Sequence, residues 1–138
     1  MRYEIGIAIQ SGDICWVNGP FFPGLVTDDL IARFKGLWDC LSETELFLAD
    51  SIYSGWRAVT PNGRNNPDQY MKKCAMARHE NVNSKFKRFA VLRAEFRHGN
   101  DRHGSVFHAI AAVCQIEIEE ESPLAQVDYD DLRYSPYE

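Results

Sequence analysis

A short apolar run that ends in an acidic residue places the strongest constraint on how this chain folds. Residues 46–49 read Leu-Phe-Leu-Ala, and Asp50 follows them directly. A brief apolar run bounded by polar turn residues is typical of a strand buried inside a sheet. A carboxylate at the end of such a strand is held at the loop side of the sheet, where α/β proteins place their chemistry. Asp50 could equally cap the next turn, since Asp is a common turn residue.

Length and composition indicate one soluble globular domain or a piece of one. The chain has 138 residues, of which 45% are hydrophobic and 25% are charged. No apolar run approaches the roughly 20 residues of a membrane helix, and the N-terminus lacks a signal peptide, so we expect an intracellular protein. The four cysteines form no Cys-x-x-Cys pair, which disfavours structural zinc and predicts reduced thiols, with Cys15 and Cys114 as small core residues. The histidines are not spaced as metal ligands either.

The N-terminal residues predict a β-hairpin. Ile5, Ile7 and Ile9 alternate with smaller or polar residues, which is the period of a half-buried strand over residues 3–10. The turn sequence Ser-Gly-Asp follows, and residues 14–18 form the next apolar run. Because the connection is so short, the two strands must pair antiparallel.

A loop, a helix and a second loop are expected around the buried strand. Residues 19–24 contain two glycines and two prolines and cannot continue a strand. Residues 28–41 start with a capping signal and carry apolar side chains at helical spacing, so they predict an amphipathic helix. Residues 54–68 are rich in Gly, Pro and Asn and show no apolar period. A loop of this length in a compact domain tends to be functional or mobile.

The C-terminal half predicts two helices. Val82, Phe86 and Phe89 are spaced as the buried stripe of a helix that runs from residue 67 or 68 to residue 89. Glu80 lies at the boundary of that stripe. Residues 88–104 are expected to form a loop with a short helical turn around Leu92. Residues 105–117 have a wide apolar face and predict the last helix, which an acidic tail follows.

The charge of the chain is unevenly distributed. The formal net charge is −5, which argues weakly against a general nucleic-acid binder. Residues 72–103 nevertheless hold nine basic and three acidic residues, an excess of +6, so the remainder carries −11. Such a basic block can be a footprint for phosphates or a solvated helix face. In the second case Glu80 would pair with Lys87 or Arg78 on the surface and contribute little.

Four motifs in this order resemble the DDE superfamily endonucleases, which include the Harbinger-like transposases. They are Gly-Asp-Ile-Cys-Trp-Val-Asn-Gly-Pro-Phe at 12–21, Ala-Asp-Ser-Ile-Tyr-Ser-Gly at 49–55, Ala-Arg-His-Glu-Asn-Val-Asn-Ser-Lys-Phe-Lys at 77–87, and the spaced pattern Arg-His … His … Val-Phe-His-Ala at 97–109. The resemblance implies an α/β fold with a truncated RNase H-like core: a β-hairpin, a helix, a buried strand, a long loop and two C-terminal helices. The domain would span residues 1–128, and residues 129–138 would be a tail.

The resemblance also implies a chemistry. Asp50 corresponds to the family's second catalytic carboxylate and Glu80 to its third, and both would bind Mg²⁺ or Mn²⁺ in a two-metal site for phosphodiester cleavage and strand transfer. The DNA of transposon ends would be the substrate, a homodimer or a second transposon-encoded protein would be the partner, and the nucleus would be the location. The residues expected beside the phosphates are Asn83, Ser84, Lys85, Lys87 and Arg88.

One departure from the family pattern changes the expected activity. The family's first catalytic Asp lies on a strand upstream of the hairpin, and none of Glu4, Asp13 and Asp28 stands in its place. We therefore expect a C-terminal piece of the nuclease domain that is weakly active or inactive alone and that leaves a sheet edge exposed. The alternatives are a domesticated or relic module that binds nucleic acid or a partner protein without catalysis, and a decayed reading frame without function.

Overall fold

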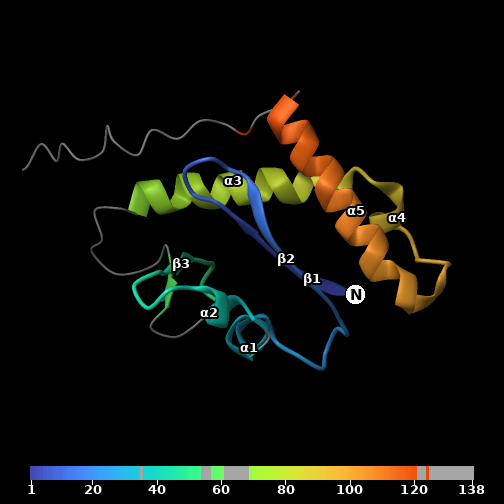
Figure 1. Cartoon of the computed structure of the whole chain (residues 1–138), viewed down its shortest axis with the longest axis horizontal. Helices are drawn as coiled ribbons and strands as arrows, with labels where there is room; N and C mark the ends of the chain where they lie inside the picture. The colour runs from blue at the N-terminus through green and yellow to red at the C-terminus, as the bar shows by residue number, and fades with distance from the viewer. Residues whose placement is uncertain (35, 54–56, 61–68, 121–123, 125–138) are drawn as a thin grey trace, which may run out of the picture.

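The chain forms a mixed α/β fold. The computed structural model describes residues 1–34, 36–53, 57–60, 69–120 and 124, so the expected tail at 129–138 lies outside the described residues (Figure 1). None of the helices in this part is long and apolar enough to cross a membrane. The elements in chain order are β1 (Arg2–Ile7), β2 (Ile14–Phe21), α1 (Asp28–Phe34), α2 (Leu37–Cys40), β3 (Phe47–Leu48), β4 (Ala58–Val59), α3 (Gln69–Lys87), α4 (Ala90–Arg93) and α5 (Gly99–Glu120).

The predicted β-hairpin is confirmed, but its first strand ends at Ile7 instead of residue 10, and its second strand is longer than expected. β1 and β2 pair antiparallel, with Ile5 opposite Val17. The prediction that residues 19–24 are a loop is wrong for the first three of them, because β2 continues to Phe21, which pairs with Arg2. Pairing with β1 therefore continues past Gly19 and Pro20, although this Gly-Pro sequence by itself favours a loop.

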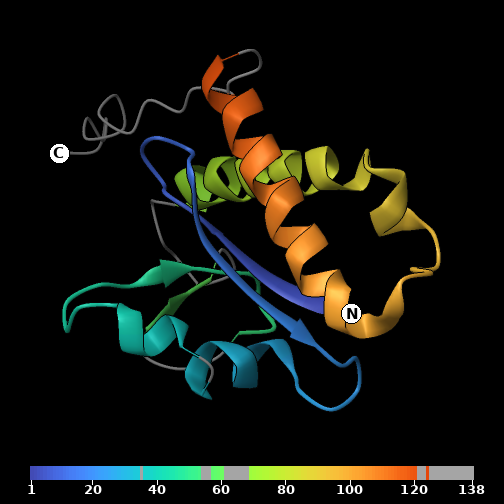
Figure 2. The same cartoon turned by 45° about the vertical axis from the view of Figure 1, so that its right-hand side comes forward.

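The core lies between the hairpin and the two long helices. Figure 2 shows α5 running across the hairpin. The predicted stripe of α3 is confirmed at Val82 and Phe86, which are buried, whereas Phe89 is partly buried. Phe107 of α5 stacks on the ring of Tyr3 with 3.6 Å between the ring centroids, and its centroid lies 5.0 Å from that of Phe86. The other buried members of this core cluster are Ile110, Ala111, Cys114, Ile118 and Leu124.

The single helix predicted over residues 28–41 is divided into α1 and α2. Gly36, between the two helices, has a φ of 122°, which L residues with a side chain rarely adopt and which no α-helix contains. The predicted cap is confirmed, since the Thr27 hydroxyl accepts a hydrogen bond from the backbone N–H of Leu30. Ile31 and Ala32 are fully buried, so α1 is anchored by its own apolar face before the chain turns at Gly36.

The predicted buried strand is only two residues long. β3 covers only Phe47 and Leu48, both partly buried, while Ala49 is buried and Leu46 is 54% exposed. β3 pairs in parallel with β4, which lies inside the loop predicted over 54–68. That prediction is therefore wrong at Ala58 and Val59, and residues 54–56 and 61–68 lie outside the described part. Two residues show no period, so only the partner strand reveals β4.

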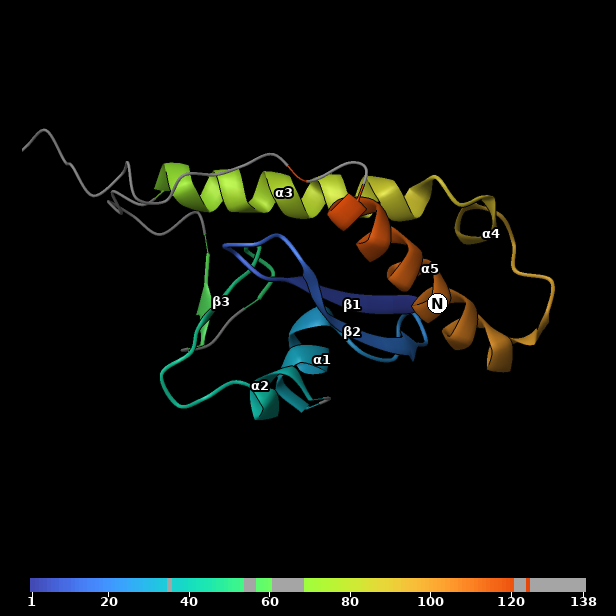
Figure 3. The ribbon, with the colours of Figure 1, turned by 45° about the horizontal axis from the view of Figure 1, so that its top comes forward.

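Both predicted C-terminal helices are present, α3 slightly shorter and α5 longer than expected. α4 forms the short turn expected around Leu92, and α3 ends at Lys87, two residues before its predicted end. The prediction of a loop over 88–104 is wrong from Gly99 onward, because α5 begins there and continues to Glu120. All four thiols are free, and Cys114 is buried as predicted, but Cys15 is exposed, so its prediction as a core residue is wrong. Figure 3 shows the layers: α3 lies on one side of the strands, and α1 and α2 lie on the opposite side.

Candidate functional site

A large cavity lies between the hairpin, β3 and α3. Its volume is about 770 Å³, and both predicted catalytic carboxylates, Asp50 and Glu80, line it. Asp50 follows the end of β3, and Glu80 projects from the middle of α3, 30 positions further along the chain. The structure therefore brings these two residues to one cavity. Asn83, which stands one turn after Glu80, lines the same cavity.

Asp50 caps the turn that follows β3. Its Oδ1 accepts a hydrogen bond of 2.6 Å from the backbone N–H of Ile52, and its carbonyl oxygen accepts one from the backbone N–H of Tyr53. This is the simpler of the two roles that the sequence allowed, and it is confirmed. The bond uses one carboxylate oxygen and restrains the side chain. The side chain is exposed to solvent, so the second oxygen can still meet a ligand in the cavity.

Glu80 is exposed on α3, and the surface ion pairs that were considered for it do not form. Among the described residues no ion pair joins Glu80 to Lys87 or Arg78. Arg78 is almost fully buried and donates from Nη1 to the carbonyl oxygen of Ile9 at 2.6 Å. Because Arg78 holds the turn that follows β1, the Glu80 carboxylate stands without a neighbouring cation from its own turn.

Asn83 is held by a relay of hydrogen bonds that ends on β1. The carbonyl oxygen of Ile5 can only accept, so His79 donates to it from Nε2 at 2.9 Å. His79 Nδ1 is then the acceptor, and the Asn83 amide donates to it at 3.4 Å. This relay ties the middle of α3 to the edge of β1 and orients Asn83 beside Glu80.

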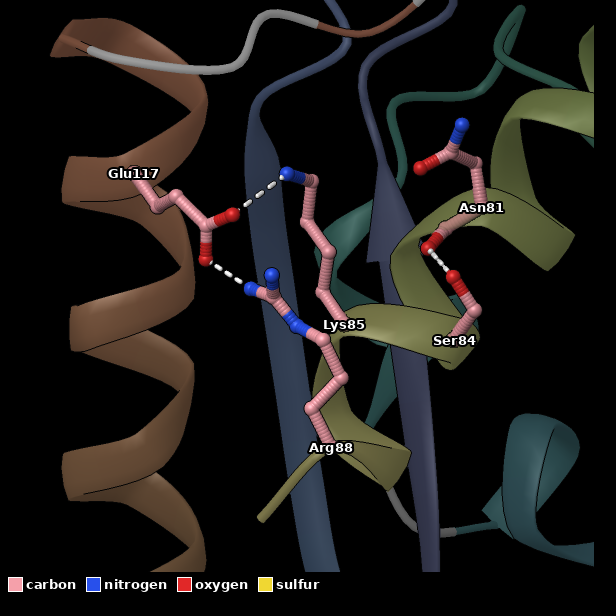
Figure 4. A network of polar contacts seen from close by, with 5 residues as sticks. All are labelled: Asn81, Ser84, Lys85, Arg88 and Glu117. Atoms are coloured by element: carbon pink, nitrogen blue, oxygen red, sulfur yellow. Dashed lines mark hydrogen bonds and ion pairs between the residues drawn. The ribbon is translucent and has the colours of Figure 1, made fainter.

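Two of the residues expected beside phosphates are instead held by a carboxylate of α5. Figure 4 shows Lys85 and Arg88 binding the two oxygens of Glu117, with 3.0 Å between Lys85 Nζ and Oε1. Lys85 is only 6% exposed. Its hydrogen bond holds the pKa of Glu117 below the ordinary value. Ser84 donates to the carbonyl oxygen of Asn81 in the same helix.

The predicted set of phosphate contacts is therefore divided. Asn83 lines the cavity, Lys85 and Arg88 neutralise Glu117, and Lys87 is exposed to solvent. Lys85, Lys87 and Arg88 do not line the cavity that contains Asp50 and Glu80. The Lys85–Glu117 contact spans 32 positions in the sequence, so neither residue type nor local spacing could identify it.

A buried carboxylate that sequence reasoning did not single out lies on the same cavity. Glu4 is 8% exposed, and its Oε2 accepts a hydrogen bond of 2.7 Å from the Trp16 indole. Burial raises the pKa of Glu4, and hydrogen bonding from Trp16 and Asn18 opposes that shift only in part. An acidic residue between Tyr3 and Ile5, in a strand otherwise rich in isoleucine, was the available signal.

The hard oxygen donors that Mg²⁺ or Mn²⁺ prefers are present on the cavity wall at Asp50 and Glu80. They are two carboxylates, and within the described ranges no three His, Cys, Asp or Glu side chains gather closely enough to hold a metal ion. The donor type therefore fits a divalent cation, while a complete ligand set needs a further group.

A second, smaller cavity of about 500 Å³ lies where β1 meets α5. Its aromatic lining includes Tyr3, Phe22, Phe96 and His103. The Tyr3 hydroxyl and His103 Nδ1 share a hydrogen bond, with 2.6 Å between the two atoms. Burial raises the pKa of Tyr3 to about 12 and lowers the pKa of His103, so this pair stays neutral near pH 7.

Comparison with protein-family models, with curated proteins and with solved structures finds no match to this chain.

Proposed function

We propose that this chain forms part of a DDE transposase-type DNA endonuclease and strand-transfer domain with an RNase H-like core. The observation that supports the proposal is the placement of Asp50 and Glu80 on one cavity, one at the end of a strand and the other on a facing helix. The sequence motifs around both residues, which resemble that family, add to it.

The placement of the two carboxylates supports roles as metal ligands. Asp50 is oriented by its bond to the Ile52 N–H, and Glu80 stands beside Asn83, whose amide is fixed through His79. Both side chains are exposed to solvent and supply hard oxygen ligands. A divalent cation, when bound, would supply Lewis acidity and an activated water for displacement at phosphorus. Because the set has two carboxylates, we expect little or no strand cleavage by this chain alone.

Titration with Mn²⁺ tests the ligand assignment. Glu80→Gln should weaken Mn²⁺ binding by about tenfold, since removing one charged ligand costs more than a kilocalorie of binding free energy. Asp50→Asn should weaken it similarly, while the asparagine oxygen still accepts the Ile52 N–H and keeps the turn. Glu120→Gln, an exposed change at the end of α5, is the control. Unchanged Mn²⁺ affinity in Glu80→Gln would count against the assignment.

A nicking assay on duplex DNA tests the expected inactivity. We expect no Mg²⁺-dependent nicking above background from the purified chain. Robust nicking that disappears in Asp50→Asn would refute the inactive part of the proposal and support the metal site.

The second candidate function is a domesticated or relic module that binds DNA in the nucleus without catalysis. The supporting observation is that the basic side chains around α4 and the N-terminal turn of α5 are exposed, namely Lys87, Arg93, Arg97 and Arg102. DNA affinity whose logarithm falls steeply with the logarithm of salt concentration would support this function. Undetectable DNA binding combined with homodimerisation would instead support a protein-interaction role.

A further inference from the structure

One face of α5 is apolar and exposed to solvent. Residues at intervals of three and four positions share one face of a helix. The buried face of α5 contains Phe107, Ile110 and Cys114, which belong to the core. Figure 2 shows this helix in front of the hairpin. The exposed residues that share the other face, called the outer stripe of α5 below, are Ala109, Ala112, Val113 and Ile116.

The outer stripe includes two large apolar side chains that the core does not cover. Val113 is 50% exposed and Ile116 is 58% exposed. Ala109 and Ala112 are small, so a second helix could approach this part of α5 closely, to an axial distance of about 8 Å.

Opposite charges stand at the two ends of the outer stripe. Arg102 precedes Ala109 and Glu120 follows Ile116 at positions that continue the same helical spacing. Both charged side chains are exposed. Within the described ranges, none of the ion pairs includes Arg102 or Glu120. The outer stripe therefore runs from a free cation to a free anion.

Both of these charges oppose the dipole of α5. The start of a helix carries a partial positive charge and its end a partial negative charge, which disfavour Arg102 and Glu120 by about 0.3–1 kcal/mol each. The last turn of α5 contains no basic residue that would offset Glu120. The two charges therefore do not stabilise their own helix, whereas a neighbouring helix of opposite direction would give each of them a favourable partner.

We propose that two copies of this chain associate through α5, with the helices antiparallel and the outer stripes in contact. Arg102 and Glu120 lie at equal distances along the sequence from Ala111. A two-fold axis at the level of Ala111 thus places Arg102 beside Glu120 of the partner subunit, and the same pair forms again at the other end. A parallel pair of helices would instead place like charges together.

The symmetry of the charges identifies a second copy as the occupant. A surface with an apolar centre and opposite charges at equal distances from its midpoint is complementary to itself after a half-turn. A contact made by one helix from each copy is smaller than the roughly 1,200 Å² of stable complexes, so we expect reversible dimerisation with a Kd of roughly 10–100 μM. The dilute chain is then a monomer.

Sedimentation equilibrium of the full chain at low salt, over roughly 2–500 μM, measures this association. Ile116→Asp should weaken dimerisation by about tenfold or more, because it places a carboxylate in the apolar centre of the contact. Ile52→Asp changes a similarly exposed isoleucine outside α5, so it is the matched control and should leave the Kd unchanged. A chain that stays monomeric over the whole range, or a Kd that Ile116→Asp does not alter, would overturn the proposal.

Exchange of the end charges tests the antiparallel direction. Arg102→Glu and Glu120→Arg each place like charges together at both ends of the dimer, so each should weaken dimerisation about tenfold at low salt and less at high salt. The double variant Arg102→Glu/Glu120→Arg should dimerise as wild type does, because it restores both pairs. An equimolar mixture of the two single variants should also associate as tightly as wild type.

Two results would overturn the antiparallel contact: single variants that dimerise as wild type does, or a double variant as weak as the single ones. Both positions are exposed in the monomer, so the variants should keep the fold. The measurement contains neither metal nor DNA, so its result is independent of the proposed nuclease function.

Discussion

Replacing Glu4 by Gln should stabilise this protein at alkaline pH. Glu4 is 8% exposed, its Oε2 accepts the Trp16 indole N–H, and its Oε1 is buried without a hydrogen bond of normal geometry. Burial raises the Glu4 pKa above the ordinary 4.5, so folding favours the protonated form. The protonated form contributes to the free energy of unfolding, and this contribution is fully present below about pH 4.5 and is lost as the pH rises through the raised pKa.

The burial and the hydrogen bonds of the Glu4 carboxylate determine how much Glu4→Gln changes the free energy of unfolding. Burying a carboxylate whose hydrogen bonds from Trp16 and Asn18 only partly replace its hydration costs about 1–3 kcal/mol, and the weaker bond from Trp16 to a neutral acceptor offsets part of the gain. We therefore expect Glu4→Gln to raise the free energy of unfolding by about 1 kcal/mol at a pH well above the raised pKa, and to have almost no effect below pH 4.5.

Urea unfolding followed by tryptophan fluorescence at several pH values measures this difference. Glu43→Gln, an exposed change in the loop after α2, is the control and should show no such pH dependence. If Glu4→Gln were more destabilising at high pH than at low pH, the ionised carboxylate would be stabilising and the reasoning would be refuted.

Two further changes test the packing of α3 against α5. Val82→Ala should lower the free energy of unfolding by about 1.5–3 kcal/mol, since Val82 is fully buried, whereas Val113→Ala, at 50% exposure on α5, should change it by less than about 0.5 kcal/mol in urea titrations. Glu117→Gln should destabilise the protein at neutral pH, because it leaves the buried Lys85 ammonium without its carboxylate. The Glu117 pKa is lowered in the fold, so this stabilisation is present above the unfolded pKa and is lost as the pH falls through the lowered one. The difference between wild type and variant should therefore close in acid, while a difference that stays constant with pH would contradict the ion pair.

The sequence predicts those elements in which an apolar pattern repeats along the whole strand or helix. Ile5 and Ile7 alternate over a whole strand, and Val82 and Phe86 repeat over a whole helix, so local pattern alone identifies the hairpin and α3. The division of α1 from α2 depends on one backbone angle at Gly36, which the apolar spacing around it does not reveal. β4 is only two residues long and is defined by its pairing with β3, so the local sequence does not predict it.

The candidate site divides in the same way. Asp50 and Glu80 were identified from local motifs, and both lie on the cavity. The expectation that Lys85 lies beside a phosphate treats a basic residue of a helix as solvated, whereas Glu117 of α5 approaches it in the fold. A contact across 32 positions depends on how α3 and α5 cross, and the sequence around Lys85 does not predict that arrangement.

The separation of the two strand pairs has a consequence for how the molecule opens. The buried core cluster and the side chains packed against it come from the hairpin, from α3, α4 and α5, from the connection at Phe89 and from Leu124 beyond α5. They include no residue of β3 or β4 among those described. Segments outside the main core open at lower free energy than the core itself. We therefore expect the amides of Phe47 and Ala49 to exchange by local opening, well before those of α3 and α5. The turn that carries Asp50 belongs to this more readily opened unit, whereas Glu80 stands on α3, whose Val82 and Phe86 are part of the core cluster, so the two carboxylates belong to units that open at different free energies.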